Sequence, residues 1–201
     1  MKKILIVANW KANPSTLRKA RELFGAVKNT GAIICPPFVY LSSLKAKGAQ
    51  DCFWAEGSFT GEISPLMLKN LGVEYVILGH SERRKYLAET AGMIKKKIKA
   101  SLKAGLKPIV CFEKIGEIRN LPKSLIFAFE PVSAIGTGKP INWQKAKKIR
   151  ESLSQFKTVL YGGSVNSKNA KDYIQKAGFQ GLLVGSASLS AKEFVKILEL
   201  G

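Results

Sequence analysis

Two residues of this chain have the chemistry of an acid–base pair, and a third adds a fixed positive charge. Glu130 directly follows the apolar segment 126–129, an unusual place for a carboxylate without a task. A carboxylate held away from water becomes a stronger base. His80 is the only histidine in the sequence. If a helix begins near Ser81, its N-terminal dipole disfavours imidazolium and leaves a neutral hydrogen-bond donor. With Lys11 as a cation that offsets substrate charge, these residues predict a proton-transfer site.

Two glycine turns suggest a place for a phosphate near that site. Gly162-Gly163-Ser164 and Gly185-Ser186 both lead into helical patterns, so their backbone N–H groups and serine hydroxyls could bind an anion. Each turn alone is more often only a tight strand-to-helix connection. Lys11, taken alone, is more often a surface lysine, and His80 could equally be a structural histidine. Their occurrence after the last two predicted strands strengthens the phosphate interpretation, because parallel barrels bind phosphate there.

The elements that must position these residues are short, β-rich apolar runs separated by helical patterns, which is typical of buried parallel strands. We predict eight strands at residues 4–8, 32–35, 52–54, 75–78, 108–112, 125–129, 158–161 and 181–184. Helical spacing is found at residues 15–28, 39–47, 65–71, 88–104, 143–155, 168–176 and 191–198. Eight such units without a low-complexity linker indicate one α/β domain over residues 1–201. The count favours a closed (β/α)₈ barrel over a doubly wound sheet.

One unit is incomplete. Only residues 113–124 join the fifth strand to the sixth, and they contain Pro122, so at most one or two helical turns fit. The fifth helix is therefore predicted to be truncated or missing. The barrel should still close, with Ile115, Ile118 and Leu121 covering the exposed apolar face.

Composition and charge argue against some classes of function for this chain. The chain has 201 residues, of which 46% are hydrophobic and 23% charged, which is a globular composition without membrane-length apolar runs. The net charge of +19 raises the possibility of nucleic-acid binding. However, no recognisable nucleic-acid motif accompanies it, and the lysines at 95, 96, 97, 99, 103, 145, 147 and 148 are expected to lie on solvated helix faces. We therefore do not expect nucleic acid as the main partner, although such a field attracts small phosphorylated anions.

The cysteines indicate the compartment. The sequence has three, an odd number, each in apolar surroundings, so a disulfide framework is not expected and a reducing cytosol is favoured. The first residues lack the features of a secretory signal, so we expect a cytoplasmic protein. With a single histidine and no CxxC pair, no metal site is expected.

Eight short motifs resemble the triosephosphate isomerase family, in the family's order and over nearly the whole chain. They are Asn9-Trp10-Lys11, Cys35-Pro36-Pro37-Phe38, Phe59-Thr60-Gly61-Glu62-Ile63-Ser64, Gly79-His80-Ser81-Glu82-Arg83-Arg84, Phe129-Glu130-Pro131-Val132, Ala134-Ile135-Gly136-Thr137-Gly138, Tyr161-Gly162-Gly163-Ser164-Val165 and Leu183-Val184-Gly185. The bacterial and eukaryotic branch is the nearer match, because the shorter archaeal form lacks the Asn-Trp-Lys opening.

The resemblance implies a TIM barrel that interconverts dihydroxyacetone phosphate and D-glyceraldehyde 3-phosphate through an enediolate, a step of glycolysis and gluconeogenesis. It implies no metal and no organic cofactor. The family is itself the standard example of a carboxylate base working with a neutral histidine, which here would be Glu130 and His80, with Lys11 acting electrostatically. It further implies substrate contacts from Asn9, Lys11, Gly136, Ser164, Gly185 and Ser186.

Around that site, the resemblance makes Glu82 a partner near Lys11, although a carboxylate at a helix start is the simpler alternative. It also implies a lid over residues 131–139 and a homodimer in which the loop from Ala55 to Ser64 inserts into the neighbouring subunit. The alternative for that loop is a long lid on a monomer.

The chain departs from the family pattern in three places. Ser133 stands where a bulky tryptophan is usual, Phe112-Glu113-Lys114 replaces Ile-Gly-Glu, and Ser186 replaces a glycine. A serine is tolerated at 186 if its φ stays negative. Two other functions remain open: another phosphosugar barrel enzyme, and a degenerate basic barrel that binds nucleic acid or a partner without catalysis.

Overall fold

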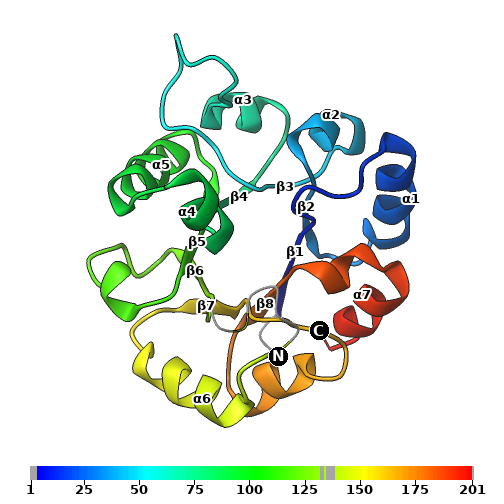
Figure 1. Ribbon diagram of the computed structural model, residues 1–201, viewed down its shortest axis with the longest axis vertical. Coiled ribbons are helices and arrows are strands. Elements are labelled where there is room, and N and C mark those ends of the chain that lie inside the picture. Colours follow the sequence, from blue (N-terminus) through cyan, green and yellow to red (C-terminus); the bar gives the residue numbers. More distant parts are fainter. Residues whose placement is uncertain (1–3, 132–133, 135–138, 201) are drawn as a thin grey trace.

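Eight parallel strands form one sheet in the order β2-β1-β8-β7-β6-β5-β4-β3, and helices surround it (Figure 1). The computed structural model describes residues 4–131, 134 and 139–200. The strands are β1 (Leu5–Asn9), β2 (Ile33–Cys35), β3 (Gly48–Ala49), β4 (Tyr75–Leu78), β5 (Lys107–Phe112), β6 (Ile126–Phe129), β7 (Thr158–Tyr161) and β8 (Gly181–Val184).

The helical elements follow the strands along the chain. The α-helices are α1 (Leu17–Val27), α2 (Leu41–Leu44), α3 (Pro65–Asn70), α4 (Ser81–Leu87), α5 (Ala91–Lys103), α6 (Trp143–Ser152) and α7 (Ala191–Leu198). The shorter turns are the 3₁₀ segments η1 (Phe38–Tyr40), η2 (Ile115–Glu117) and η5 (Ser186–Leu189), and the π-helical segment η4 (Asp172–Lys176). In the described part of the chain, no helix has the length and apolar character needed to cross a membrane.

The sheet curls until its two end strands, β2 and β3, lie against each other. Gly48 of β3 has no space for a side chain, because a Cβ atom there would lie 2.4 Å from Cys35 Sγ of β2. Just after β3, the Gln50 side chain donates a hydrogen bond to the Cys35 carbonyl, with an N···O distance of 2.9 Å. The predicted (β/α)₈ TIM barrel is therefore confirmed as a nearly closed barrel.

Alternate residues along the strands face two different cores. One core contains only strand residues and fills the barrel interior, with Val7, Ile77, Ile109, Ala128 and Leu160 among its buried members. The other, larger core lies between the outer face of the strands and the helices. Because both faces of each strand are buried, the strands read in sequence as short continuous apolar runs.

The prediction for the third strand was wrong. The strand lies at Gly48–Ala49, whereas residues 52–54 lie beyond it in the loop towards α3. In this loop Phe53 and Trp54 stack on each other, with ring centroids 4.0 Å apart, and Phe59 packs on Phe53. Aromatic residues are common in strands, so their clustering imitated a strand signal, whereas the closely packed β3 requires small residues that give none.

The prediction for the fifth helix is confirmed. Only the single 3₁₀ turn η2 lies between β5 and β6. Ile118 at the end of this turn is buried, and Ile115 and Leu121 are partly buried against the same outer core. These three side chains therefore cover part of the surface that a full helix would cover.

One expectation about the lysines was also wrong. Lys97 on α5 is 2% exposed instead of solvated. Its turn of α5 faces the barrel, and its ammonium group contacts the carboxylates of Asp51 and Glu89, both of which are buried. Arg83 adds a second cation, 2.9 Å from Asp51. The lysine is buried because two carboxylates compensate for the loss of water.

Candidate active site

Lys11 lies just beyond β1 in a strained backbone conformation. Its φ is +54°, a value that non-glycine residues adopt rarely and at an energetic cost. Two side chains hold this conformation: Asn9 Oδ1 accepts a hydrogen bond from the Lys11 N–H at 3.0 Å, and Gln50 Nε2 donates to the Lys11 carbonyl at 2.8 Å. The position of the lysine is thus fixed by the last residue of β1 and the residue that follows β3.

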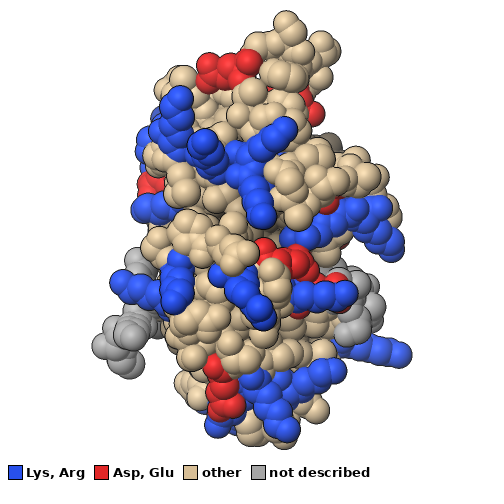
Figure 2. All heavy atoms as spheres, turned by 90° about the vertical axis from the view of Figure 1, so that its left-hand side faces the viewer, with Lys and Arg blue, Asp and Glu red and all other residues tan. Residues whose placement is uncertain are grey.

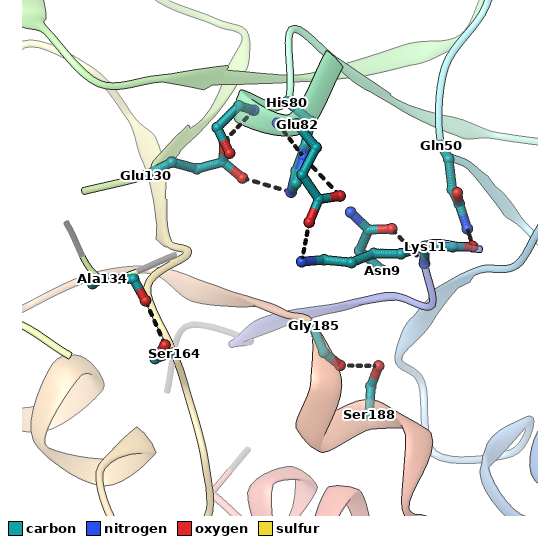
Figure 3. Close-up of polar contacts among 11 residues, drawn as sticks. Asn9, Lys11, Gln50, His80, Glu82, Glu130, Ala134, Ser164, Gly185 and Ser188 are labelled. Carbon is teal, nitrogen blue, oxygen red and sulfur yellow. Dashed lines mark hydrogen bonds and ion pairs between the residues drawn. The ribbon is translucent and has the colours of Figure 1, made fainter. Parts of the chain in front are cut away.

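The Lys11 ammonium group points across the barrel mouth towards Glu82 on the first turn of α4 (Figure 3). The Nζ–Oε1 distance is 2.6 Å, and the two side chains are 25% and 37% exposed. The expected proximity of Glu82 to Lys11 is therefore observed. An ion pair that is partly exposed contributes little stability, so its main effect is to orient the lysine.

His80 caps the N-terminus of α4, and this fixes its ring. Nδ1 accepts a hydrogen bond from the Glu82 N–H at 3.2 Å. An accepting Nδ1 carries a lone pair, so the ring is neutral with its proton on Nε2. That assignment follows from the hydrogen bonds around the ring. The contacts of the buried His80 therefore fit the neutral N–H donor that the sequence suggested, and that role stays a prediction.

Glu130 follows β6 and faces His80. Its Oε1 lies 3.1 Å from His80 Nε2, and its Oε2 accepts a hydrogen bond from the Ser81 N–H at 2.9 Å. The side chain is 3% exposed. Burial raises the pKa of the Glu130 carboxyl above its ordinary value, and the contacts with His80 and Ser81 only partly oppose this effect. A carboxylate in this environment is a stronger base than one in water.

The wall opposite these residues is made by the turns after β7 and β8 (Figure 3). Ser164 has a φ of +48°, and its hydroxyl donates a hydrogen bond to the Ala134 carbonyl. Gly185 leads into η5, where the Ser188 hydroxyl donates to the Gly185 carbonyl at 2.7 Å. Ser186 is not among the residues with positive φ, so serine is tolerated at this position.

A cavity of about 240 Å³ brings the predicted residues together. It is lined by Asn9, Lys11, His80, Glu130, Ser164, Gly185 and Ser186, together with Gly162, Val165, Asn166, Leu183 and Ala187. Gly136, Ser133 and most of the expected lid at 131–139 lie outside the described residues. Within the described ranges there is no group of three or more histidine, cysteine, aspartate or glutamate residues that could hold a metal ion.

Sequence reasoning missed two residues of this site. Gln50 supports Lys11 but follows a strand that was placed incorrectly, so its position at the barrel mouth was not recognised. Asn166 lines the cavity, and its Oδ1 accepts hydrogen bonds from the N–H groups of Lys168 and Asn169. An asparagine just before a helical pattern is the available signal for such a cap.

Fold and site together define an α/β barrel with a carboxylate, a neutral imidazole and an ammonium group at the carboxyl ends of its strands. Comparison with known proteins gives the family. The family model described as triosephosphate isomerase matches residues 4–124 and 114–201. The two matched segments overlap at the short connection between β5 and β6, which agrees with a deletion there.

Similar curated proteins carry the same description. Triosephosphate isomerases from two strains of Dehalococcoides mccartyi are 40% and 42% identical over 244 aligned residues, covering 98% of this chain and 96% of each relative. A triosephosphate isomerase from Natranaerobius thermophilus is 37% identical over 248 aligned residues, covering all of this chain and 96% of the relative. This chain belongs to the triosephosphate isomerase family.

Proposed function

We propose that this protein is an isomerase that interconverts dihydroxyacetone phosphate and D-glyceraldehyde 3-phosphate by proton transfer. The single observation that carries the proposal is the pairing of a buried Glu130 with a neutral His80 whose Nε2 lies 3.1 Å from the carboxylate, inside the cavity that Lys11 also lines. Family membership supports the same reaction.

The contacts of Glu130 suggest how the reaction begins. His80 Nε2 lies 3.1 Å from Glu130 Oε1 and directs its proton at that oxygen. A substrate carbonyl oxygen that takes over this hydrogen bond frees Oε1 to accept a proton from the neighbouring carbon. The Ser81 N–H meanwhile continues to hold Oε2. The protonated Glu130 then returns the proton to the adjacent carbon, and the hydroxyl proton moves from one enediolate oxygen to the other by way of His80. Together these transfers convert ketose to aldose.

Charge on the enediolate and the phosphate has to be compensated. His80 donates to the enediolate oxygen and Lys11 lies across the same cavity, so both stabilise negative charge as it develops. The phosphate is assigned to the opposite wall, where Ser164, Gly185 and Ser186 lie, with Asn9 as a further substrate contact. The family pattern adds Gly136. The reaction proposed here uses no metal and no organic cofactor.

We also propose a two-fold homodimer of this single-domain chain. The connection between β3 and α3 extends from Gln50 to Ser64 and projects from the barrel (Figure 1). Phe59 in this loop is 43% exposed, and Val39, Tyr86 and Leu87 on η1 and α4 are 76%, 70% and 59% exposed. We propose that these exposed apolar side chains contribute to the dimer interface. Light scattering at micromolar concentration should give twice the monomer mass, whereas a fully active monomer would contradict the dimer.

The three cysteines support a reducing cytoplasm as the compartment. All three are free and buried. In an oxidising compartment a chain of this size commonly uses its cysteines in disulfides.

A coupled spectrophotometric assay tests the proposed reaction. Untagged protein should convert D-glyceraldehyde 3-phosphate to dihydroxyacetone phosphate in the presence of EDTA. The same preparation should bind duplex DNA no more tightly than ordinary non-specific contacts at physiological salt. Absence of turnover together with tight, strongly salt-dependent DNA binding would favour the degenerate basic barrel instead.

A further inference from the structure

The shortened connection between β5 and β6 still carries one half-buried carboxylate. Glu117 lies in η2, the one helical turn that remains there. Its Oε2 is 2.8 Å from Arg84 Nη1, and its Oε1 accepts a hydrogen bond from the Lys114 N–H at 3.0 Å. The turn is thus closed by the same carboxylate that pairs with Arg84.

Arg84, on α4, ties together the ends of two neighbouring strands. Its Nε donates to the Gly79 carbonyl at 2.8 Å, and its Nη2 donates to the Cys111 carbonyl at 3.0 Å. Gly79 immediately precedes His80. The Phe112 carbonyl, one residue after Cys111, accepts a hydrogen bond from the Glu130 N–H at 2.8 Å. The guanidinium group therefore links the backbone segments that carry the histidine and the carboxylate.

The Arg84 guanidinium group lies very close to the backbone of Gly79. Its φ is +72°, and a Cβ atom there would lie 3.3 Å from Arg84 Nη2. The guanidinium group therefore packs directly against the turn that presents His80. Movement of Arg84 would leave the Gly79 and Cys111 carbonyls without this donor and would loosen the turn.

Arg84 faces the outer side of the barrel next to a second cavity. A cavity of about 370 Å³ lies beside it, lined by Ser81, Lys85, Phe112, Glu113, Glu117 and Glu130 along with Gly79 and Arg84. Figure 2 shows this side of the molecule, where basic side chains predominate over acidic ones. Arg84 and Glu117 are 29% and 25% exposed, so their pair is only partly screened by water.

We propose that Glu117, acting through Arg84, is a positioning residue that sets the geometry between His80 and Glu130. This inference rests on the proposed isomerase function. In this chain, the remnant of the fifth β–α unit thus has a catalytic consequence besides covering the core. Arg84 uses three different nitrogens to contact Gly79, Cys111 and Glu117, and such a planar fork fixes geometry in a way that a point charge does not.

Glu117→Gln tests the proposal, with Glu113→Gln as the matched control. Glu113 lies on the same connection, is exposed and lines the same cavity. We expect Glu117→Gln to lower kcat about tenfold with little change in KM, because small displacements of catalytic groups cost rate more than binding. The inhibition constant of inorganic phosphate should stay unchanged, since the phosphate wall is on the opposite side. Glu113→Gln should behave as the wild type.

A second readout does not depend on activity. His80 is the only histidine in the chain, so its ring ¹⁵N and Nε2–H resonances in untagged protein report on this one site. These resonances should shift in Glu117→Gln and should stay unchanged in Glu113→Gln. They should also shift in Arg84→Lys, because lysine keeps the positive charge but lacks the several nitrogens of the guanidinium group. An inactive wild type would refute the proposed function, whereas the resonances would still test the positioning role.

Two results would overturn the inference. One is a Glu117→Gln protein with a lower melting temperature but unchanged kcat and unchanged His80 resonances, which would show a purely structural role. The other is an equal weakening of kcat and of phosphate inhibition, which would show a general loosening of the barrel mouth.

Discussion

Ile118→Ala measures how much the short β5–β6 connection contributes to stability. Ile118 is 1% exposed and belongs to the core between the strands and the outer elements. It lies at the end of η2, where a complete barrel of this class has a helix. Removing the larger part of this side chain deletes buried apolar surface and leaves a space that the short connection fills only in part.

The expected cost follows from the burial. Truncation of a buried isoleucine to alanine destabilises by about 2 to 5 kcal/mol, and we expect about 3 kcal/mol here. For a chain of this size, about 2 to 4 °C in Tm corresponds to each kcal/mol, so Tm should fall by about 10 °C. Leu102→Ala is the control, because Leu102 on α5 is 45% exposed and its truncation should change the free energy of unfolding by less than about 0.5 kcal/mol.

Calorimetry or circular dichroism at equal protein concentrations would measure both variants, since dimerisation makes Tm depend on concentration. An Ile118→Ala protein destabilised by less than about 1 kcal/mol would refute the reasoning. The connection would then not be a working substitute for the missing helix.

Three further outcomes are expected. The acid limb of the kcat/KM profile should lie above the ordinary carboxyl pKa of 4.5, because burial raises the pKa of Glu130 and the reaction needs its ionised form; a limb at or below that value would contradict this. Burial of Glu130 favours its protonated form, so the contribution of this group to the stability of the folded protein is greatest below pH 4.5 and falls as pH rises through the raised pKa of Glu130. Glu130→Gln removes this charge and should therefore have a higher Tm than the wild type at pH 7. The difference in Tm should shrink on acidification. Lys97→Met should destabilise by about 3 to 5 kcal/mol, because it leaves Asp51 and Glu89 buried beside each other without their lysine, whereas Lys99→Met on the exposed face of α5 should be nearly neutral in a urea titration.

Much of the fold could be predicted because each buried strand is a short apolar run with a distinct break on either side. Seven of the eight predicted strands overlap the observed strands, and only the third was misplaced. Gly48 and Ala49 carry no strand signal, since close packing against β2 requires small residues there. Their role depends on a contact with Cys35, which is distant in sequence.

The candidate site was predictable to the extent that its residues lie within two positions of a strand's carboxyl end. Glu130, His80 and Lys11 have this placement and meet in one cavity. Gln50 and the Asp51–Lys97 pair were not predicted, because their roles arise from partners brought close only by folding. A lysine in a run of lysines gives no sign of burial until the carboxylates that compensate for it are known.

The turnover of Glu130→Gln tests the central claim most directly, which is that this carboxylate moves the proton. Glutamine keeps the size of the side chain and can still accept the hydrogen bond that the Ser81 N–H donates to Glu130, so the fold should be retained. The account predicts a kcat lower by about 10³-fold, which is within the usual contribution of a general base. A folded Glu130→Gln protein with turnover near that of the wild type would contradict it.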